Sequence, residues 1–285
     1  MSRNFFIIDG HSQLYQAYYA ITGLTTPSGQ PINAVYGFTR MLRKILKEDK
    51  PSYMAIAFDS RGPTFRHLEY KEYKIHRKTT PDDLISQIPL MYDVINAYNI
   101  PFYAIQGYEA DDIIGTISKK LSKEKIECTI ITTDKDMEQL IDKYIKIFNP
   151  RKKEINDLEK MRKEKGIEPE NIIDILALGG DSSDNIPGIP GIGYKTALYL
   201  IREWKSLENV LANVDKINGK RKQENLLKYI ESARLSKRLA TINTEVPLDF
   251  SLESCRLTNF DNIKLNELFT KYGFNSFLTE NHDNN

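Results

Sequence analysis

The chain has 285 residues, enough for about two domains, and its 40 Lys and Arg nearly balance its 39 Asp and Glu. With 40% hydrophobic and 28% charged residues it has the composition of a globular protein, not a disordered one. No segment approaches the 18 apolar residues of a membrane span, and the first residues do not form a secretion signal. We therefore expect a cytoplasmic protein without membrane contact, whose Cys128 and Cys255 are free thiols. A net charge near zero excludes a uniformly basic surface for nucleic acid. It is compatible with separate acidic and basic surfaces whose charges offset each other.

The first half alternates strand-like and helix-like segments. Short apolar segments at 5–9, 53–59 and 128–134 predict buried strands, and 145–149 predicts a further one. Apolar residues spaced by three and four predict helices at 34–48, 83–98 and 110–124. This alternation predicts a parallel sheet flanked by helices, an α/β domain over residues 1–172.

The second half is mainly helical. The pattern predicts helices from Asn171 onward, including 196–204, 223–242 and 262–273. The loop 181–196 is too rich in glycine and proline to lie inside a helix or strand. We therefore predict a second, helical region over residues 173–285.

Acidic residues follow the predicted strands. The three apolar strands end in Asp9, Asp59 and Asp134, and the carboxyl ends of parallel strands border the ligand crevice of an open sheet. Six further acids stand at the start of the helix at 110 and in two loops: Glu109, Asp111, Asp112, Asp136, Asp181 and Asp184. Taken singly, each is explained as a turn residue or a helix cap.

Together, nine converging carboxylates would repel one another strongly unless cations offset their charge. Carboxylates without histidine or cysteine suit hard ions such as Mg²⁺ or Mn²⁺. Two such ions are the arrangement that serves phosphoryl hydrolysis. The acids therefore favour a two-metal site over a set of solvated acids.

Two segments are basic. Residues 61–78 hold six Lys and Arg against two Glu, with Tyr70 and Tyr73 between them, and residues 195–238 have a net charge of +6. Cations with interleaved aromatic rings suit a nucleic-acid strand, although a solvated helix has the same composition.

The glycine-rich loop before Lys195 fits neither of the two common phosphate-binding motifs. Tyr194 stands where the P-loop requires lysine, and Thr196 stands where the GxGxxG motif requires its third glycine. A glycine-rich turn that opens a helix nevertheless presents N–H groups to phosphates.

These motifs occur together in a known family. The segments IIDGHSQLY, AVYGFTRML, AFDSRGPTFRH, YKIHR, GYEADDIIG, TTDKDMEQL, GDSSDNIPGIPGIGYKTA and SKRLATINTEVPL follow one another in family order. The chain resembles the 5′ nuclease (flap endonuclease, 5′-3′ exonuclease) domain found at the N-terminus of bacterial DNA polymerase I or as a separate protein. The resemblance implies a PIN-like sheet, a helical arch at about 61–90 and a helix–loop–helix DNA clamp at about 181–201. It also implies metal-dependent hydrolysis of DNA at 5′ flaps and ends, in replication and repair.

The resemblance implies a role for each candidate residue. All nine acids would hold two divalent ions, with Asp112 either a ligand or a neighbour of one. Lys74 and Arg77 would be the catalytic basic pair, and Tyr73 a stacking ring. DNA contacts would come from Arg61, Arg66, Gly188, Gly191, Gly193, Lys195 and Thr196, with K⁺ at the clamp. The protein would be a monomer, fused to a DNA polymerase or working with one.

Two positions depart from the family pattern. Gln16 replaces a common Arg, which puts a phosphate contact in doubt, and Tyr194 replaces a frequent Glu in the clamp. Two other functions stay open: an RNase of the PIN-like architecture, and a junction-binding module without catalysis. The complete acid set argues against the second, and the arch and clamp argue against the first.

Overall fold

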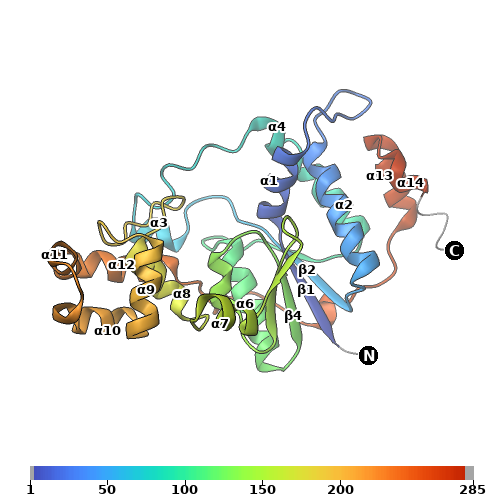
Figure 1. Ribbon diagram of the computed structural model, residues 1–285. Helices are drawn as coiled ribbons and strands as arrows, with labels where there is room; N and C mark the ends of the chain where they lie inside the picture. Colours follow the sequence, from blue (N-terminus) through green and yellow to red (C-terminus); the bar gives the residue numbers. More distant parts are fainter. Residues whose placement is uncertain (1–2, 280–285) are drawn as a thin grey trace.

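A computed structural model describes residues 3–279 and centres on one six-stranded sheet (Figure 1). The strand order is β3-β2-β1-β4-β5-β6, and only β6 runs antiparallel to its neighbour. The strands are β1 (Asn4–Asp9), β2 (Tyr53–Ala57), β3 (Phe102–Tyr103), β4 (Glu127–Ile131), β5 (Ile145–Asn149) and β6 (Glu154–Asn156). The predicted parallel α/β sheet is confirmed, and β5 has the predicted bounds.

Both faces of the sheet are covered, which explains why β2 is apolar at every position and β1 is apolar between its two end residues. Phe6 and Ile8 pack on one face with α1 (Gly10–Ala20), α2 (Asn33–Glu48) and α5 (Ile88–Ala97). Phe5 and Ile7 point to the opposite face, as alternation along a strand requires, and pack with α6 (Ala110–Lys123). The short α7 (Leu158–Lys165) follows β6.

A helical lobe stands beside the sheet, at the left of Figure 1. It consists of α8 (Asn171–Gly179), α9 (Tyr194–Trp204), α10 (Leu207–Ala212), α11 (Lys220–Lys228) and α12 (Ile230–Ala240). The single helix predicted at 223–242 is two helices, because α11 ends at Lys228 and α12 begins at Ile230, with Tyr229 between them. The 3₁₀ turn η2 (Val214–Lys216) lies in this lobe, whereas η1 (Asp136–Leu140) lies between β4 and β5, and η3 (Glu253–Cys255) follows α12.

The arch, residues 61–90, crosses from the helical lobe to α1 (Figure 1). It contains the short helices α3 (Phe65–Glu69) and α4 (Asp82–Ile85). The helix predicted at 83–98 is divided, because α5 starts at Ile88 with Pro89 in its first turn, the position that tolerates a missing N–H.

The last described segment departs from the predicted domain boundary. The helices α13 (Asn262–Tyr272) and α14 (Asn275–Thr279) share a core with α2 and α5, not with the helical lobe. Before them, the Phe250 ring packs edge-on against Phe5 at 5.9 Å, and the amide of Leu257 donates to the carbonyl of Ser52 at 3.1 Å. Residues 246–279 therefore belong with the sheet, and the assignment of 173–285 to one helical region is wrong over this part.

One smaller expectation is met. Cys128 and Cys255 are free and buried. Between residues 3 and 279, the structure has no helix that is long and apolar enough to cross a membrane.

Candidate metal centre and nucleic-acid interface

Three acids follow the central strands at one edge of the sheet. Asp9 ends β1, and its two carboxylate oxygens accept from the amide of Ser12 (3.0 Å) and the hydroxyl of Thr132 (2.8 Å). Asp59 follows β2, and its Oδ1 accepts from the amide of Ala110 at the start of α6 (2.8 Å). Because β2 and β4 end earlier than predicted, Asp59 and Asp134 lie on the loops just past the strands. The sheet edge and the start of α6 thus share one set of carboxylates.

Five more acids join them, so that eight form the acidic cluster: Asp9, Asp59, Glu109, Asp111, Asp134, Asp136, Asp181 and Asp184. Glu109 caps α6 and Asp111 lies in its first turn, while Asp136 begins η1. Asp181 and Asp184 come from the loop after α8. Each acid of the cluster interacts electrostatically with at least one other. Elements far apart in sequence therefore bring the predicted acids to one place.

Burial and mutual repulsion disfavour the charged form of several of these acids. Burial, reinforced by Asp59 and Asp134, raises the pKa of Asp9 to about 7. Burial, reinforced by Asp134 and Asp181, raises the pKa of Asp136 to about 8. The pKa values of Asp111 and Asp134 are raised by burial and by neighbouring acids. A divalent cation would relieve this repulsion, so the donor set fits a hard metal ion.

This arrangement predicts an unusual pH dependence. A carboxyl whose pKa is higher in the folded than in the unfolded chain stabilises the fold at low pH, and loses that contribution as pH rises through the folded value. Between about pH 6.5 and about pH 8.5, Asp9 and Asp136 lose their protons in the metal-free protein. This loss should lower the unfolding free energy by on the order of 2 kcal/mol. The lowered pKa of half-buried His11 acts in the opposite sense, mainly below this pH range.

Urea unfolding in EDTA and in saturating Mg²⁺ checks this. In EDTA the unfolding free energy should fall over this pH range. In Mg²⁺ the fall should disappear, because metal binding displaces the protons. A metal-free protein that becomes more stable towards pH 8.5 would contradict the assignment.

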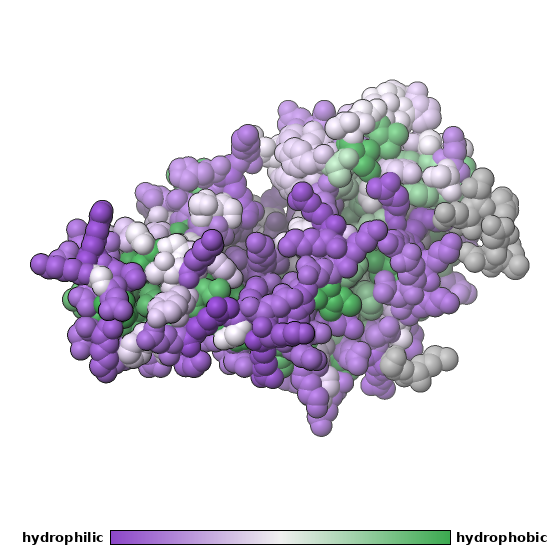
Figure 2. Space-filling view, in the orientation of Figure 1, coloured by the Kyte–Doolittle hydropathy of each residue, from purple (hydrophilic) through white to green (hydrophobic). Residues whose placement is uncertain are grey.

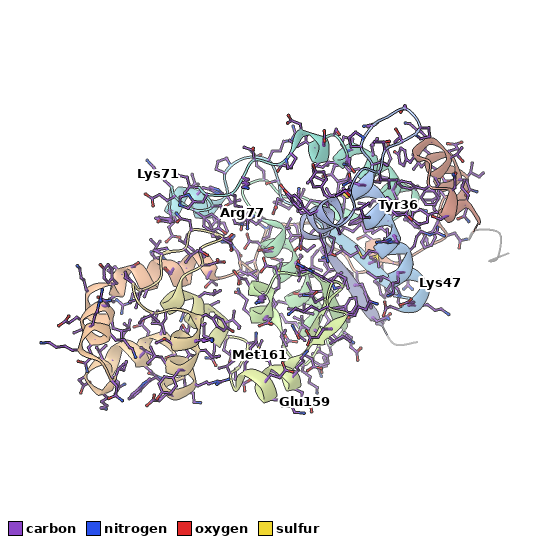
Figure 3. The ribbon with its side chains drawn as sticks, turned by 45° about the horizontal axis from the view of Figure 1, so that its top comes forward. Tyr36, Lys47, Lys71, Arg77, Glu159 and Met161 are labelled. Carbon is purple, nitrogen blue, oxygen red and sulfur yellow. The ribbon has the colours of Figure 1, made fainter. Side chains whose placement is uncertain are left out.

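Basic residues of the arch reach into the acidic cluster. Lys74 Nζ lies 2.7 Å from Glu109 Oε1 and 3.6 Å from Asp184 Oδ2, and the Arg77 guanidinium donates to Asp184 Oδ1 at 2.7 Å. Burial opposes the charge of Asp184, but Lys74 and Arg77 outweigh it and hold the pKa of this carboxyl below its usual value. Figure 3 shows Lys71 at the outer margin of the molecule and Arg77 nearer its middle. The predicted catalytic pair thus lies against two predicted metal ligands.

The acids do not form a ready-made cage. In the part of the chain that the structure describes, no three His, Cys, Asp or Glu side chains stand close enough together to hold a metal ion. Two of the acids are paired with the arch instead. Binding of an ion therefore requires the side chains of the cluster to move towards it.

Tyr73 differs from its predicted role as a stacking ring. Its side chain is buried, and its hydroxyl donates to Glu109 Oε2 and to Asp184 Oδ2, each at 3.1 Å. A ring enclosed in this way offers no face to a base. In this arrangement Tyr73 orients two acids, and its stacking on a base stays a prediction.

Arg66 and Asp112 are also placed differently from the prediction. Arg66 is 2% exposed and donates to both oxygens of Asp112 at 2.8 Å, and to Glu109 at 3.2 Å. Asp112 also accepts from the amides of Glu109 and Asn243. In this arrangement Arg66 has no exposed donor to offer a phosphate, and both oxygens of Asp112 are occupied. The predicted DNA contact and metal ligation by these two residues stay predictions. The two side chains form a buried ion pair that fixes the start of α6.

A cavity of about 1260 Å³ opens beside the acidic cluster. Its lining includes Asp9, Asp59, Asp111 and Asp134, together with Lys74 and Arg77 from the arch. Arg61, a predicted DNA contact, also lines it, as does Gln16. Figure 2 shows a hollow between the helical lobe and the rest of the molecule, bordered mainly by hydrophilic residues.

The glycine-rich loop joins α8 to α9 and is held from behind by α12. The amide of Gly188 donates to Ser236 Oγ and its carbonyl accepts from Ser232 Oγ, each at 2.9 Å. Since this amide is buried and already donates to Ser236, it is not free to donate to a phosphate in this arrangement. Four predicted contacts lie further along the loop and in the first turn of α9: Gly191, Gly193, Lys195 and Thr196. All are at least partly exposed, as is Tyr194.

The backbone at Gly188 explains why only glycine fits there. Its φ is +60°, and a Cβ atom would lie 2.3 Å from the amide nitrogen of Gly180. We expect Gly188→Ala to cost about 3 kcal/mol or more of unfolding free energy, because left-handed backbone and a clash with backbone add up. Urea unfolding measures this.

Gly193→Ala is the matched control. Gly193 has ordinary φ (−94°) and nothing within 4 Å of the added atom. This variant should lose no more than about 0.5 kcal/mol. Equal stability of the two variants would contradict the account of the loop.

Some residues of the site were missed in the sequence. Thr132 bonds Asp9, and His11 Nδ1 accepts from the amide of Asp59 at 2.9 Å. Lys78 and Arg151 line the cavity. His11 belongs to the segment IIDGHSQLY, so its position next to Asp9 was a usable signal. Nothing local to Arg151 indicated that it would face the acids.

The comparisons with known proteins agree with this geometry. The profile for the N-terminal resolvase-like domain of 5′-3′ exonucleases matches residues 4–168, and that for their C-terminal SAM fold matches residues 167–263. DNA polymerase I of Bacillus caldotenax is 43% identical over 283 residues, which cover 98% of this chain and 32% of that protein. DNA polymerase I of Bacillus subtilis is 40% identical over 277 residues, or 95% of this chain and 31% of that protein. The chain thus spans about a third of the length of these relatives.

Solved structures have the same fold. T5 5′-exonuclease with bound zinc matches with a TM-score of 0.72 and 22% identity, over 85% of this chain and 90% of that one. The catalytic core of Rad2 in complex with DNA substrate matches with a TM-score of 0.64 and 17% identity, over 95% and 88%. These likenesses confirm the predicted PIN-like sheet with its helical region.

Proposed function

Because the chain belongs to the 5′-3′ exonuclease family, we propose that it hydrolyses DNA phosphodiester bonds at 5′ flaps and 5′ ends with two divalent metal ions. The observation that supports this most is the acidic cluster at the sheet edge, whose buried carboxyls have raised pKa values and lie beneath a basic arch. We take Mg²⁺ or Mn²⁺ as the ions, since all the donors are carboxylates.

The eight acids divide between two ions. Asp9, Asp59, Glu109 and Asp111 would hold or frame one, and Asp134, Asp136, Asp181 and Asp184 the other. Bound ions would supply activation of a water molecule and neutralisation of phosphate charge. Thr132 and Ser12 keep both oxygens of Asp9 oriented, and Tyr73 does the same for Glu109 and Asp184.

Lys74 and Arg77 have a second function in this proposal. They now neutralise Glu109 and Asp184, which would themselves be ligands. With ions bound at these acids, the side chains of Lys74 and Arg77 would be free to stabilise the negative charge that develops on the scissile phosphate. Burial lowers the pKa of Lys74, but Glu109 and Asp184 outweigh it and raise the pKa above its usual value, so the residue stays charged at neutral pH.

The helical lobe would hold the duplex part of the substrate. Gly191, Gly193, Lys195 and Thr196 offer exposed backbone or side-chain donors at the start of α9, which suit phosphate contacts without sequence readout. A K⁺ ion at this loop has less support. The carbonyl of Gly188 accepts from Ser232 and that of Pro190 from Asn225, so the ion would need other carbonyls.

The cellular setting extends the same proposal. We propose a cytoplasmic monomer that acts on DNA in replication and repair, fused to a DNA polymerase or working beside one. The support is the similarity to one third of DNA polymerase I in two bacilli.

Incubation with an end-labelled 5′-flap duplex tests the function. We expect cutting near the junction in Mg²⁺ or Mn²⁺ and none in EDTA. Equal cutting in both would contradict the metal requirement. Binding without cutting in any divalent metal would indicate a junction-binding module, and preference for single-stranded RNA would indicate an RNase.

A further inference from the structure

The cavity beside the acidic cluster has a basic residue on a wall that the arch does not form. Arg151 lies in the turn between β5 and β6 and lines the same cavity as Asp9, Asp111 and Asp134. We propose that Arg151 binds a phosphate of the strand being cut, from a part of the cavity lining that the arch with Lys74 and Arg77 does not form. This inference rests on the proposed function and adds a substrate-positioning residue to it.

The turn holds Arg151 in a fixed place. Asn149 Oδ1 accepts from the amides of Arg151 and Lys152, each at 3.1 Å. A side chain that bonds the backbone two and three residues ahead makes a stable turn. Figure 1 shows this turn (yellow-green) rising from the sheet on the side of the arch. The base of the Arg151 side chain is therefore positioned before any ligand arrives.

The guanidinium of Arg151 is uncommitted, in contrast to those nearby. Arg66 and Arg77 are paired with acids. Arg151 is exposed, and no ion pair of this residue occurs within residues 3–279. It can therefore donate to a ligand without first breaking an ion pair.

The chemistry of the ligand follows from the cavity. A guanidinium matches the planar pair of oxygens of a phosphodiester. The acids of the same cavity would repel a free anion, so a phosphate must be carried there by a larger ligand that is held elsewhere. A nucleic-acid strand held by the helical lobe and the arch meets this condition.

The test measures binding and leaves catalysis aside. Flap duplexes are titrated in EDTA with the wild type, with Arg151→Ala and with Lys152→Ala. Lys152→Ala is the control, because it also removes one positive charge, but from a neighbouring residue that does not line the cavity. We expect Arg151→Ala to bind about tenfold more weakly at about 0.1 M salt and to lower the salt slope by about one. Lys152→Ala should change affinity less than threefold.

A second measurement locates the contact. Single methylphosphonate groups, which remove the charge of one phosphate, are placed along the cut strand. One position near the cleavage site should weaken binding by the wild type and by Lys152→Ala, but not by Arg151→Ala. If wild type binds flaps and Arg151→Ala responds to every position as Lys152→Ala does, the inference is wrong. If wild type does not bind flaps, the proposed function itself fails.

Discussion

Replacement of Asp134 by asparagine is expected to lower the rate of flap cutting by about a thousandfold, equivalent to about 4 kcal/mol of transition-state stabilisation. Asp134 interacts with Asp9, Asp111, Asp136 and Asp184, so it lies between the two groups of proposed ligands. The asparagine side chain has nearly the same shape, and its carbonyl oxygen can still accept from the backbone N–H of Asp136. In the wild type this hydrogen bond to Asp134 Oδ1 is 2.9 Å long. Asparagine lacks the charge that a hard cation requires. Single-turnover cleavage in Mg²⁺ measures the effect.

The same substitution should not weaken the fold. Burial and neighbouring acids disfavour the charge of Asp134 in metal-free protein, so its loss should leave the unfolding free energy in EDTA unchanged or increase it. Flap binding in EDTA should also be retained. Asp249→Asn, at an exposed position, is the control and should cut at the wild-type rate. Cutting by Asp134→Asn within tenfold of wild type would remove Asp134 from the metal site.

Replacement of Arg66 by methionine is expected to cost about 3–5 kcal/mol of unfolding free energy. The change leaves Asp112, which is fully buried, without its cationic partner. It also removes donors from the carbonyls of Leu239 and Thr241, at 2.8 and 3.0 Å. These hydrogen bonds hold the arch, α6 and the end of α12 together. Their loss therefore loosens the elements that carry the acidic cluster. Urea unfolding in EDTA measures the change.

Arg61→Met provides a matched control. Arg61 lies in the same basic segment but is exposed, so this variant should stay within about 0.5 kcal/mol of wild type. A loss below about 1 kcal/mol for Arg66→Met would show that the buried ion pair does not support the site.

The contrast between Arg66 and Arg61 shows where reasoning from the sequence reaches its limit. Both residues belong to a basic stretch that predicts a DNA-binding surface. The partners that bury Arg66 are 43 to 175 residues away in the chain, and no local pattern reveals them. The burial of Tyr73 was hidden for the same reason, because its partners Glu109 and Asp184 are 36 and 111 residues away.

Local patterns were more informative where the chain's own neighbours determine structure. The helix predicted at 110–124 is α6, Ala110–Lys123, whose start is fixed by Glu109 and Asp112 in a capping box. That cap is the ordinary explanation first considered for these acids, and Asp112 takes part in it in this structure. By contrast, α13 was predicted as a helix, but its packing on α2 and α5 depends on the tertiary fold.

The acidic cluster lies between these two cases. Strand ends placed Asp9, Asp59 and Asp134 at one edge because parallel strands share a direction. The loop that adds Asp181 and Asp184 could be located only through the family's motifs. The near-equal numbers of acidic and basic residues conceal this separation into an acidic cluster at the sheet edge and a basic arch.

Diffraction from crystals soaked in Mn²⁺, recorded to locate the metal by its anomalous signal, tests the central claim most directly. We expect two manganese peaks within the acidic cluster, one beside Asp9 and Asp111 and the other beside Asp134 and Asp184. Lys74 and Arg77 should withdraw from Glu109 and Asp184 in the same crystals. Saturated crystals that show no manganese at this edge of the sheet would contradict the account.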